Sequence, residues 1–120
     1  MLKREWQRFC RRAAWSWAGW LECWRSEHSL HQWLWANLVS AGLALWLPLS
    51  GTERALILAL GVLVLAAELM NSAVERVVDY ISTEPHELAR QAKDMASAAV
   101  AVTAIAAGLA WAAVLWELLG

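Results

Sequence analysis

Three long stretches of the sequence carry no Asp, Glu, Lys or Arg, and they predict helices that cross a membrane. They are residues 30 to 52, 55 to 67 and 95 to 116. A helix needs about 20 residues to cross the hydrocarbon layer of a bilayer, so the first and third stretches suffice alone. The second suffices only if it continues to residue 74 with Glu68 near one end. We therefore expect three spans, at about residues 30 to 49, 54 to 80 and 94 to 118.

The segment before these stretches has a pattern typical of a helix that lies in the membrane interface. At 100° per residue its apolar side chains fall within an arc of about 120°. They are Trp6, Phe9, Cys10, Ala13, Trp17, Trp20, Leu21 and Trp24. Arginines occupy the other face, as in helices that lie along the headgroups. We expect this interfacial helix at about residues 5 to 27, followed by the three spans in one all-α membrane domain.

Composition and charge support a membrane location and suggest an orientation. The chain is 60% hydrophobic, and ten of its 120 residues are Trp, a side chain that prefers the membrane interface. Of the ten Lys and Arg residues, six precede the first span, three lie between the second and third, and only Arg54 lies between the first and second. The positive-inside rule then places the N-terminus in the cytoplasm and the C-terminus outside. Because the basic residues lie beside spans, we expect anionic lipid headgroups as their partners and no nucleic acid.

Breaker residues predict where the helices end. Pro48 is expected to end the first span, and residues 50 to 52 to form a tight turn into the second. Thr83 or Glu84 is the expected N-cap of the third helix, with Pro85 in its first turn. Further along, the four-residue spacing of Ala104, Gly108 and Ala112 is typical of close helix approach in membranes. The polar residues expected on one face of the start of the third helix are His86, Arg90, Lys93, Asp94 and Ser97.

A polar stripe runs along the second span in the sequence ELMNSAVERVVD, residues 68 to 79. Glu68, Asn71, Ser72, Glu75 and Asp79 fall within an arc of about 100°, and the stripe begins inside the apolar layer. An ionisable residue at mid-span costs about 2.5–3.5 kcal/mol and usually has a function. A helix that merely emerges into water explains Asp79 and Glu75, but it leaves Glu68 and Asn71 unexplained.

The spacing of these carboxylates suggests a division of roles. Glu68 and Glu75 lie roughly 10 Å apart along a helix, too far to share one ion unaided. We expect Glu68 to accept a proton near the lipid, and Glu75 to hold a hydrated cation together with Glu27. With Lys93 and a further cation, Arg8, nearby, these groups fit phosphoryl transfer to a hydroxyl at the membrane surface. The sequence contains no GxxxxGK[ST] motif, so a bound ATP would not use a P-loop.

The sequence resembles the prokaryotic diacylglycerol kinase family, small trimeric membrane enzymes, from Arg8 to the C-terminus. The resemblance rests on ELMNSAVERVVD, on HELARQAKDMASAAV (residues 86 to 100), and on Ser16, Trp17, Gly19, Trp24 and Glu27. It implies ATP as co-substrate, Mg²⁺ as cofactor, phosphatidic acid as product, and a multi-pass location in the bacterial inner membrane with the C-terminus in the periplasm. It also implies a homotrimer whose active sites are shared between neighbouring subunits.

The resemblance also implies a role for each matching residue. Glu68 matches the proton acceptor and also contacts the lipid, and Glu27 and Glu75 match the nucleotide ligands linked to magnesium. Asn71 and Asp79 belong to the same motif as supporting residues. The other expected nucleotide contacts are Arg8, Trp15, Glu84, His86, Lys93 and Asp94. The other expected lipid contacts are Arg12, Ser16, Trp24, Trp46, Arg54, Ser97, Trp111 and Trp116.

Three points remain open at the level of sequence. Trp15 plots on the polar face of its helix, so it is equally well explained as an ordinary surface residue. His31 and Trp33 stand where the family often has Arg and Glu, which leaves open any polar contact that those two would make. An undecaprenol kinase is the alternative within the family, although the SAAV run and the Trp-rich helix favour the Gram-negative diacylglycerol type. A non-enzymatic membrane subunit that binds divalent ions is the alternative from another class.

Overall fold

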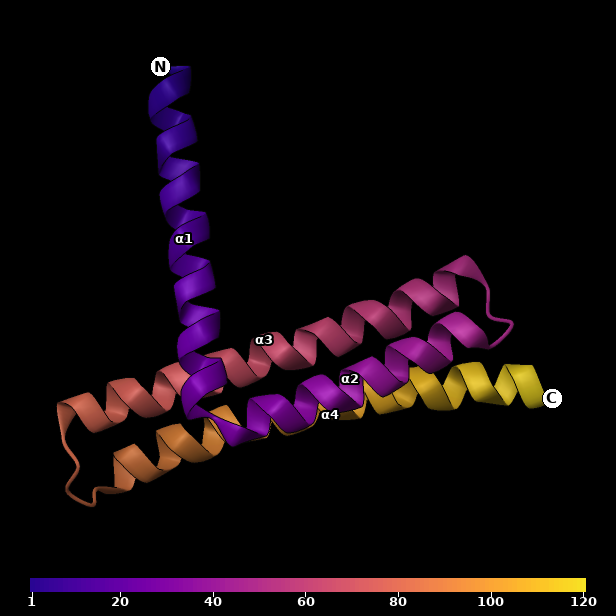
Figure 1. Ribbon diagram of the computed structural model, residues 1–120. Helices are drawn as coiled ribbons and strands as arrows, with labels where there is room; N and C mark the ends of the chain where they lie inside the picture. Colours follow the sequence, from indigo (N-terminus) through magenta and orange to yellow (C-terminus); the bar gives the residue numbers. More distant parts are fainter.

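The computed structural model describes the whole chain, Met1–Gly120, as four α-helices joined by short connections (Figure 1). They are α1 (Leu2–Ser26), α2 (His28–Trp46), α3 (Gly51–Ile81) and α4 (Glu87–Leu119). Their lengths are 25, 19, 31 and 33 residues, respectively. The predicted all-α fold is confirmed. Helix α1, which precedes the first predicted span, ends at a sharp junction at Glu27.

Helix α1 runs crosswise to the other three helices, which lie side by side (Figure 1). Only the C-terminal part of α1 reaches them. Glu27 makes the corner, because its extended backbone (φ −113°, ψ 109°) both ends α1 and begins α2. The carboxylate of Glu27 therefore lies at the junction of the arm and the bundle.

Helix α3 is central, with α2 and α4 packed against it, while the backbones of α2 and α4 do not approach each other closely. Three polar contacts join α2 to α3. In each pair the two residue numbers add up to nearly the same value, so the two helices run antiparallel in a single register. These pairs are Ser29 with Glu68, Asn37 with Gly61, and Ala44 with Arg54. The register thus brings the start of α2 to the level of Glu68.

Two of the helices, α3 and α4, are long and apolar enough to cross a membrane. Helix α2 does not meet the same requirement of length and apolar character. It carries His28, His31, Gln32 and Asn37 among its 19 residues, and these offset its leucines. The predicted span over α2 therefore stays a prediction, whereas α3 and α4 have the length and apolar character that a span needs.

The chain has little internal core, since only 12 of its 120 residues are buried. The largest cluster, which includes Ala44, Ile57 and Val114, lies at the end where α2 turns into α3. Close helix approach occurs at Gly61, where a Cβ atom would lie 2.5 Å from Asn37 Oδ1. The predicted approach at Gly108 is wrong within one chain, because nothing lies within 4 Å of the corresponding Cβ position. Asn37, a polar residue that the small-residue pattern does not detect, supplies the contact instead.

The N-termini of α3 and α4 are capped in different ways. Ser50 and Glu53 form a reciprocal capping box that starts α3 in the predicted turn. The N-cap of α4 is His86, whose Nδ1 accepts the Leu88 N–H at 3.0 Å. The prediction of Thr83 or Glu84 as N-cap, with Pro85 inside the helix, is wrong. Proline restricts the residue before it to extended conformations, and here the chain stays non-helical until His86.

Candidate functional site

Glu68 is the most deeply buried carboxylate of the chain, with 4% of its surface exposed. Ser29, the second residue of α2, donates a hydrogen bond from its Oγ to Glu68 Oε1. One turn further along α3, Ser72 is equally buried and accepts a hydrogen bond of 3.5 Å from Cys23 Sγ of α1. Polar groups from three helices therefore meet around a carboxylate that the sequence places within an apolar stretch.

The corner between α1 and α2 packs against α3 partway along the polar stripe of residues 68 to 79. Helix α1 meets α3 through the Cys23–Ser72 contact and through a hydrogen bond from Arg76 to Ser26. At 1.5 Å per residue, Glu68 lies about 6 Å from Ser72 on the side of the apolar bundle. Glu75 and Asp79 follow Ser72 toward the opposite end of α3. Glu75 lies between Ser72 and Arg76, the two residues that α1 contacts, so it is level with α1, whereas Glu68 lies one turn toward the apolar bundle.

Asn71 and Glu75 form a second polar group on α3. Asn71 Nδ2 donates to Glu75 Oε1 at 3.4 Å, while Asn71 Oδ1 is buried and has no hydrogen-bond partner. An unpaired amide oxygen beside a carboxylate fits a hard cation such as Mg²⁺, which prefers oxygen ligands. Within one chain, however, no three His, Cys, Asp or Glu side chains are grouped to hold a metal ion. One chain therefore does not complete the site that Glu27 and Glu75 were expected to share.

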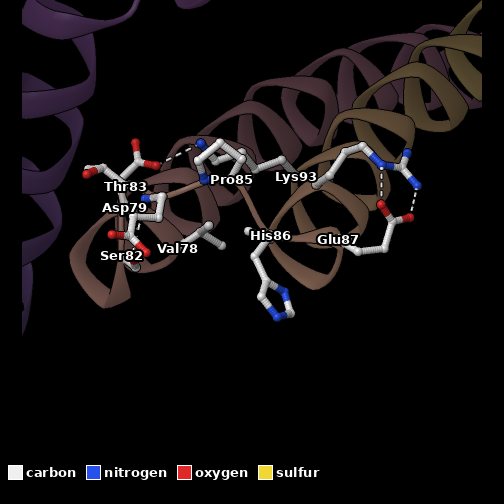
Figure 2. A pocket seen from close by; sticks show the side chains of 11 residues that line it. Val78, Asp79, Ser82, Thr83, Pro85, His86, Glu87 and Lys93 are labelled. Carbon is white, nitrogen blue, oxygen red and sulfur yellow. Dashed lines mark hydrogen bonds and ion pairs between the residues drawn. The ribbon is translucent and has the colours of Figure 1, made fainter.

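A charged groove of about 540 Å³ lies at the turn between α3 and α4 (Figure 2). Its lining includes three expected nucleotide contacts, Glu84, His86 and Lys93, together with the supporting residue Asp79. Lys93 Nζ donates to Asp79 Oδ1 at 2.7 Å, and this hydrogen bond raises the pKa of Lys93. Lys93 precedes the charge-free part of α4, which begins at Met95. Its ammonium is therefore held at the mouth of the groove, outside the apolar layer.

Arg90, which was not predicted as a site residue, organises the rest of this groove. It forms ion pairs with Glu87 and, at 2.8 Å, with Asp94, an expected nucleotide contact (Figure 2 shows the pair with Glu87). In the sequence, Arg90 falls on the same helix face as Lys93 and Asp94, and this spacing indicated that it would lie beside them. In Figure 2 the imidazole of His86 points away from the Asp79–Lys93 pair, as its capping role requires.

Four expected site residues, Arg8, Arg12, Trp15 and Ser16, are exposed on the arm that α1 extends away from the bundle (Figure 1). Arg8 pairs only with Glu5 of the same helix, at 2.9 Å, and Ser16 bonds to the Arg12 carbonyl. A single chain does not bring any of these four side chains to Glu68 or to the groove.

Four expected lipid contacts lie at or toward the opposite end of the bundle. Arg54 donates to the Ala44 and Leu47 carbonyls at 2.7 and 3.2 Å, so it closes the C-terminal end of α2. It is 14 residues from Glu68, about 21 Å along α3. Trp111 Nε1 donates to Ser40 at 2.8 Å. The remaining two, Trp46 and Trp116, are exposed. Ser97, another expected lipid contact, is exposed on α4.

The junction of α1 and α2 contains a contact that the sequence did not predict. His31 Nε2 donates to the Trp24 carbonyl at 2.7 Å, and the two rings stack with centroids 3.7 Å apart. The Trp24 carbonyl is one of the last four of α1, which have no partner within the helix. His31, a departure from the family pattern, thus makes a polar contact within its own chain and stiffens the corner at Glu27.

Comparison with known proteins identifies the family. A sequence model described as prokaryotic diacylglycerol kinase matches residues 14–115, which is most of the chain. The chain belongs to the prokaryotic diacylglycerol kinase family. A diacylglycerol kinase of Escherichia coli strain K12 is 39% identical over 113 residues, covering 94% of this chain and 93% of that protein. A diacylglycerol kinase of Pseudomonas aeruginosa strain PAO1 is also 39% identical, over 91% of this chain and 89% of its own length.

A third relative supports the same assignment over a shorter region. The diacylglycerol kinase of Haemophilus influenzae is 52% identical over 54 residues, which is 45% of this chain and 46% of that protein. Membership of the prokaryotic diacylglycerol kinase family makes the chain a membrane-associated kinase of lipid metabolism, and a kinase takes ATP as co-substrate. The resemblance found in the sequence is confirmed, and an enzyme is favoured over a non-enzymatic ion-binding subunit.

Proposed function

We propose that this kinase transfers the γ-phosphate of ATP to the hydroxyl of diacylglycerol at the cytoplasmic face of the bacterial inner membrane, giving phosphatidic acid. The observation that carries the proposal is the division of α3 by the corner of α1 and α2. A buried carboxylate lies on the side of the apolar bundle, and a charged groove lies beyond the corner. The lipid hydroxyl and the phosphates of the nucleotide need these two environments.

Glu68 is the proposed general base. It accepts the proton of the diacylglycerol hydroxyl while that oxygen bonds to the γ-phosphorus and the bond from phosphorus to the leaving oxygen of ADP breaks. The position of Glu68 within an apolar stretch of α3 supports this role, because a base for a lipid hydroxyl must lie near the depth of the hydrocarbon layer.

The nucleotide is proposed to bind at the corner and in the groove beyond it. Glu27 and Glu75 would hold Mg²⁺, with Asn71 beside Glu75 as a further oxygen donor, and the ion would neutralise charge on the phosphates. Asp79 keeps Lys93 in place at the groove. The proposed nucleotide contacts are Arg8, Trp15, Glu27, Glu75, Glu84, His86, Lys93 and Asp94.

The proposed assembly is a homotrimer in which neighbouring subunits share each site. This accounts for two features of the single chain. The exposed arm of α1 carries Arg8, Arg12, Trp15 and Ser16 away from their own Glu68 (Figure 1), and Glu27 and Glu75 form no metal cluster within one chain. Neighbouring subunits would supply the missing partners.

In the membrane, α2 is proposed as a third span beside α3 and α4, with α1 in the cytoplasmic interface and the C-terminus in the periplasm. The charge distribution of the sequence supports this orientation. The acyl chains would then extend along the bundle toward its periplasmic end. The proposed lipid contacts are Arg12, Ser16, Trp24, Trp46, Arg54, Glu68, Ser97, Trp111 and Trp116.

Diacylglycerol is favoured over undecaprenol because the matched relatives are named diacylglycerol kinases. The test is purified protein in mixed micelles with ATP, Mg²⁺ and each lipid in turn, followed by detection of the phosphorylated lipid. We expect phosphatidic acid with diacylglycerol and at least about tenfold lower kcat/KM with undecaprenol, a 1.4 kcal/mol preference. Preferential phosphorylation of undecaprenol would replace the proposed substrate, and no product from either lipid would reject the activity.

A further inference from the structure

Ser29 makes the only side-chain hydrogen bond of Glu68. Its Oγ donates to Glu68 Oε1 across the interface of α2 and α3, from a position 39 residues earlier in the chain. The other hydroxyl near this site, Ser72, is engaged with Cys23 Sγ. Ser29 is therefore the one residue in the chain that holds the orientation of this buried carboxylate directly.

We propose that Ser29 is a positioning residue for phosphoryl transfer, which fixes the carboxylate of Glu68 so that Oε2 faces the lipid hydroxyl. This inference rests on the proposed role of Glu68 as the base. The hydroxyl of Ser29 itself does not touch the reacting atoms.

The need for such a residue follows from the geometry of glutamate. The terminal torsion of a Glu side chain has a broad, nearly two-fold distribution, so the carboxylate plane is not fixed by rotamer preference. An ionised carboxylate only accepts hydrogen bonds, and one strong donor on one oxygen selects one orientation of the plane. With Oε1 occupied by Ser29, Oε2 is the oxygen left for the proton of the substrate.

The position of Ser29 fixes where its hydroxyl lies. Ser29 is in the first turn of α2, directly after the corner at Glu27. Its hydroxyl is therefore held by the helix backbone at the level where α2 meets Glu68 of α3.

The test compares five variants, three of them at Ser29, with rates expressed per folded protein. Ser29→Ala removes the donor, and we expect kcat to fall about tenfold or more, because a misplaced reacting group can cost up to about 10²-fold. We expect the KM values for MgATP and diacylglycerol to change less than about twofold, since neither ligand loses a contact. Ser29→Thr keeps the hydroxyl and should restore most of kcat. Ser29→Cys offers a weaker donor of similar size and should give an intermediate kcat.

The matched control is Ser72→Ala, which removes an equally buried hydroxyl that does not contact Glu68. It measures what the loss of a buried hydroxyl at this helix junction costs in folding. We expect Ser29→Ala to lower kcat clearly more than Ser72→Ala does at comparable thermal stability.

Glu68→Gln in the same assay separates failure of this inference from failure of the proposed function. If Glu68→Gln is inactive and Ser29→Ala keeps the parental kcat, Ser29 has no positioning role and the base assignment stands. If Ser29→Ala and Ser29→Thr lose kcat equally, the hydroxyl is not the cause and the inference is rejected. If Glu68→Gln keeps activity, the base assignment falls and the role of Ser29 falls with it.

Discussion

The two polar regions along α3 are built in opposite ways. Around Glu68, contacts join segments that are 39 and 49 residues apart, and the groups are buried. Around the turn to α4, Arg90 and His86 contact residues at most four positions away, and most groups are exposed. Only the Lys93–Asp79 pair joins two helices there. The geometry of the first region depends on how whole helices pack, whereas that of the second is mostly local.

This difference has energetic consequences. A buried polar group that loses its partner costs about 1–3 kcal/mol, whereas an exposed ion pair contributes roughly 0–1 kcal/mol. We therefore expect substitutions in the buried region to act sharply and those in the exposed groove to act gradually.

The largest effect is expected for Glu68→Gln. The substitution removes the proposed base while preserving its size, so activity should fall by roughly 10²–10⁴-fold, the contribution typical of general base catalysis. Steady-state phosphorylation of diacylglycerol measures the loss, and chromatography with nucleotide binding checks that assembly is preserved. Activity within tenfold of the parent would exclude Glu68 as the base.

The next effect is expected for Glu75→Gln and Glu27→Gln. Each removes one anionic oxygen ligand, so the Mg²⁺ concentration for half-maximal activity should rise by about tenfold or more. A titration of free Mg²⁺ at saturating ATP and lipid measures the shift. Glu117→Gln, which removes an exposed carboxylate near the C-terminal end of α4 and outside the proposed site, serves as the control. Unchanged Mg²⁺ dependence in both carboxylate variants would contradict the shared clamp.

A moderate effect is expected when two variants are mixed at a Mg²⁺ concentration too low for Glu27→Gln to be active. If a site takes Glu27 from one subunit and Glu68 with Glu75 from its neighbour, a random mixture of Glu27→Gln and Glu68→Gln subunits leaves about one interface in four intact in a closed ring. Activity near a quarter of the parent should appear from two inactive parents. Mixtures that exchange subunits and remain inactive would show that each site belongs to one chain.

The smallest effect is expected for Lys93→Met. The groove loses one cation, so the KM for MgATP should rise by a few-fold. The kcat should stay close to that of the parent, because the contact is expected to be equally strong in the ground state and the transition state. Lys93→Arg keeps the charge and is the control. A large fall in kcat with unchanged KM would move Lys93 from nucleotide binding into the chemical step.

The pair with Asp79 also predicts how the effect of Lys93 depends on pH. Since the hydrogen bond to Asp79 raises the pKa of Lys93 above its value in the unfolded chain, the resulting stabilisation is fully present below about pH 10.4, the ordinary Lys pKa. It is lost as pH rises through the higher pKa of the folded state. The difference in thermal stability between parent and Lys93→Met should therefore be the same at about pH 7 and pH 9 and decline only above pH 10.4.

The sequence predicted the local features of this molecule well. The amphipathic pattern identified α1, the charge-free stretches identified the three helices of the bundle, and the stripe on α3 singled out Glu68, which is buried. The error at the start of α4 is also local. Pro85 fits a first helical turn as readily as a position before one, and the capping hydrogen bond that His86 accepts from the Leu88 N–H decided between them.

The contacts between helices could not be predicted in the same way. Periodicity indicates which residues share a face of one helix, but the register between two helices depends on which side chains fit where they meet. Asn37 against Gly61 and Ser29 against Glu68 are such contacts, 24 and 39 residues apart. The roles of the site residues remain predictions, because on the proposed function they depend on the nucleotide, the lipid and neighbouring subunits.

The unequal lengths of the helices have a consequence for the lipid around this kinase. Helix α2 is about 28 Å long, close to the hydrocarbon thickness of a bilayer, whereas α3 and α4 are about 46 and 50 Å long. The α2–α3 turn and the C-terminus of α4 lie at the same end (Figure 1), so the excess length projects beyond the corner at Glu27. On the proposed topology, bilayer thickness sets how far the groove rises above the headgroups. Host lipids with longer acyl chains would draw the groove toward the membrane surface, and a membrane of unsuitable thickness would slow the enzyme even when its substrate is abundant.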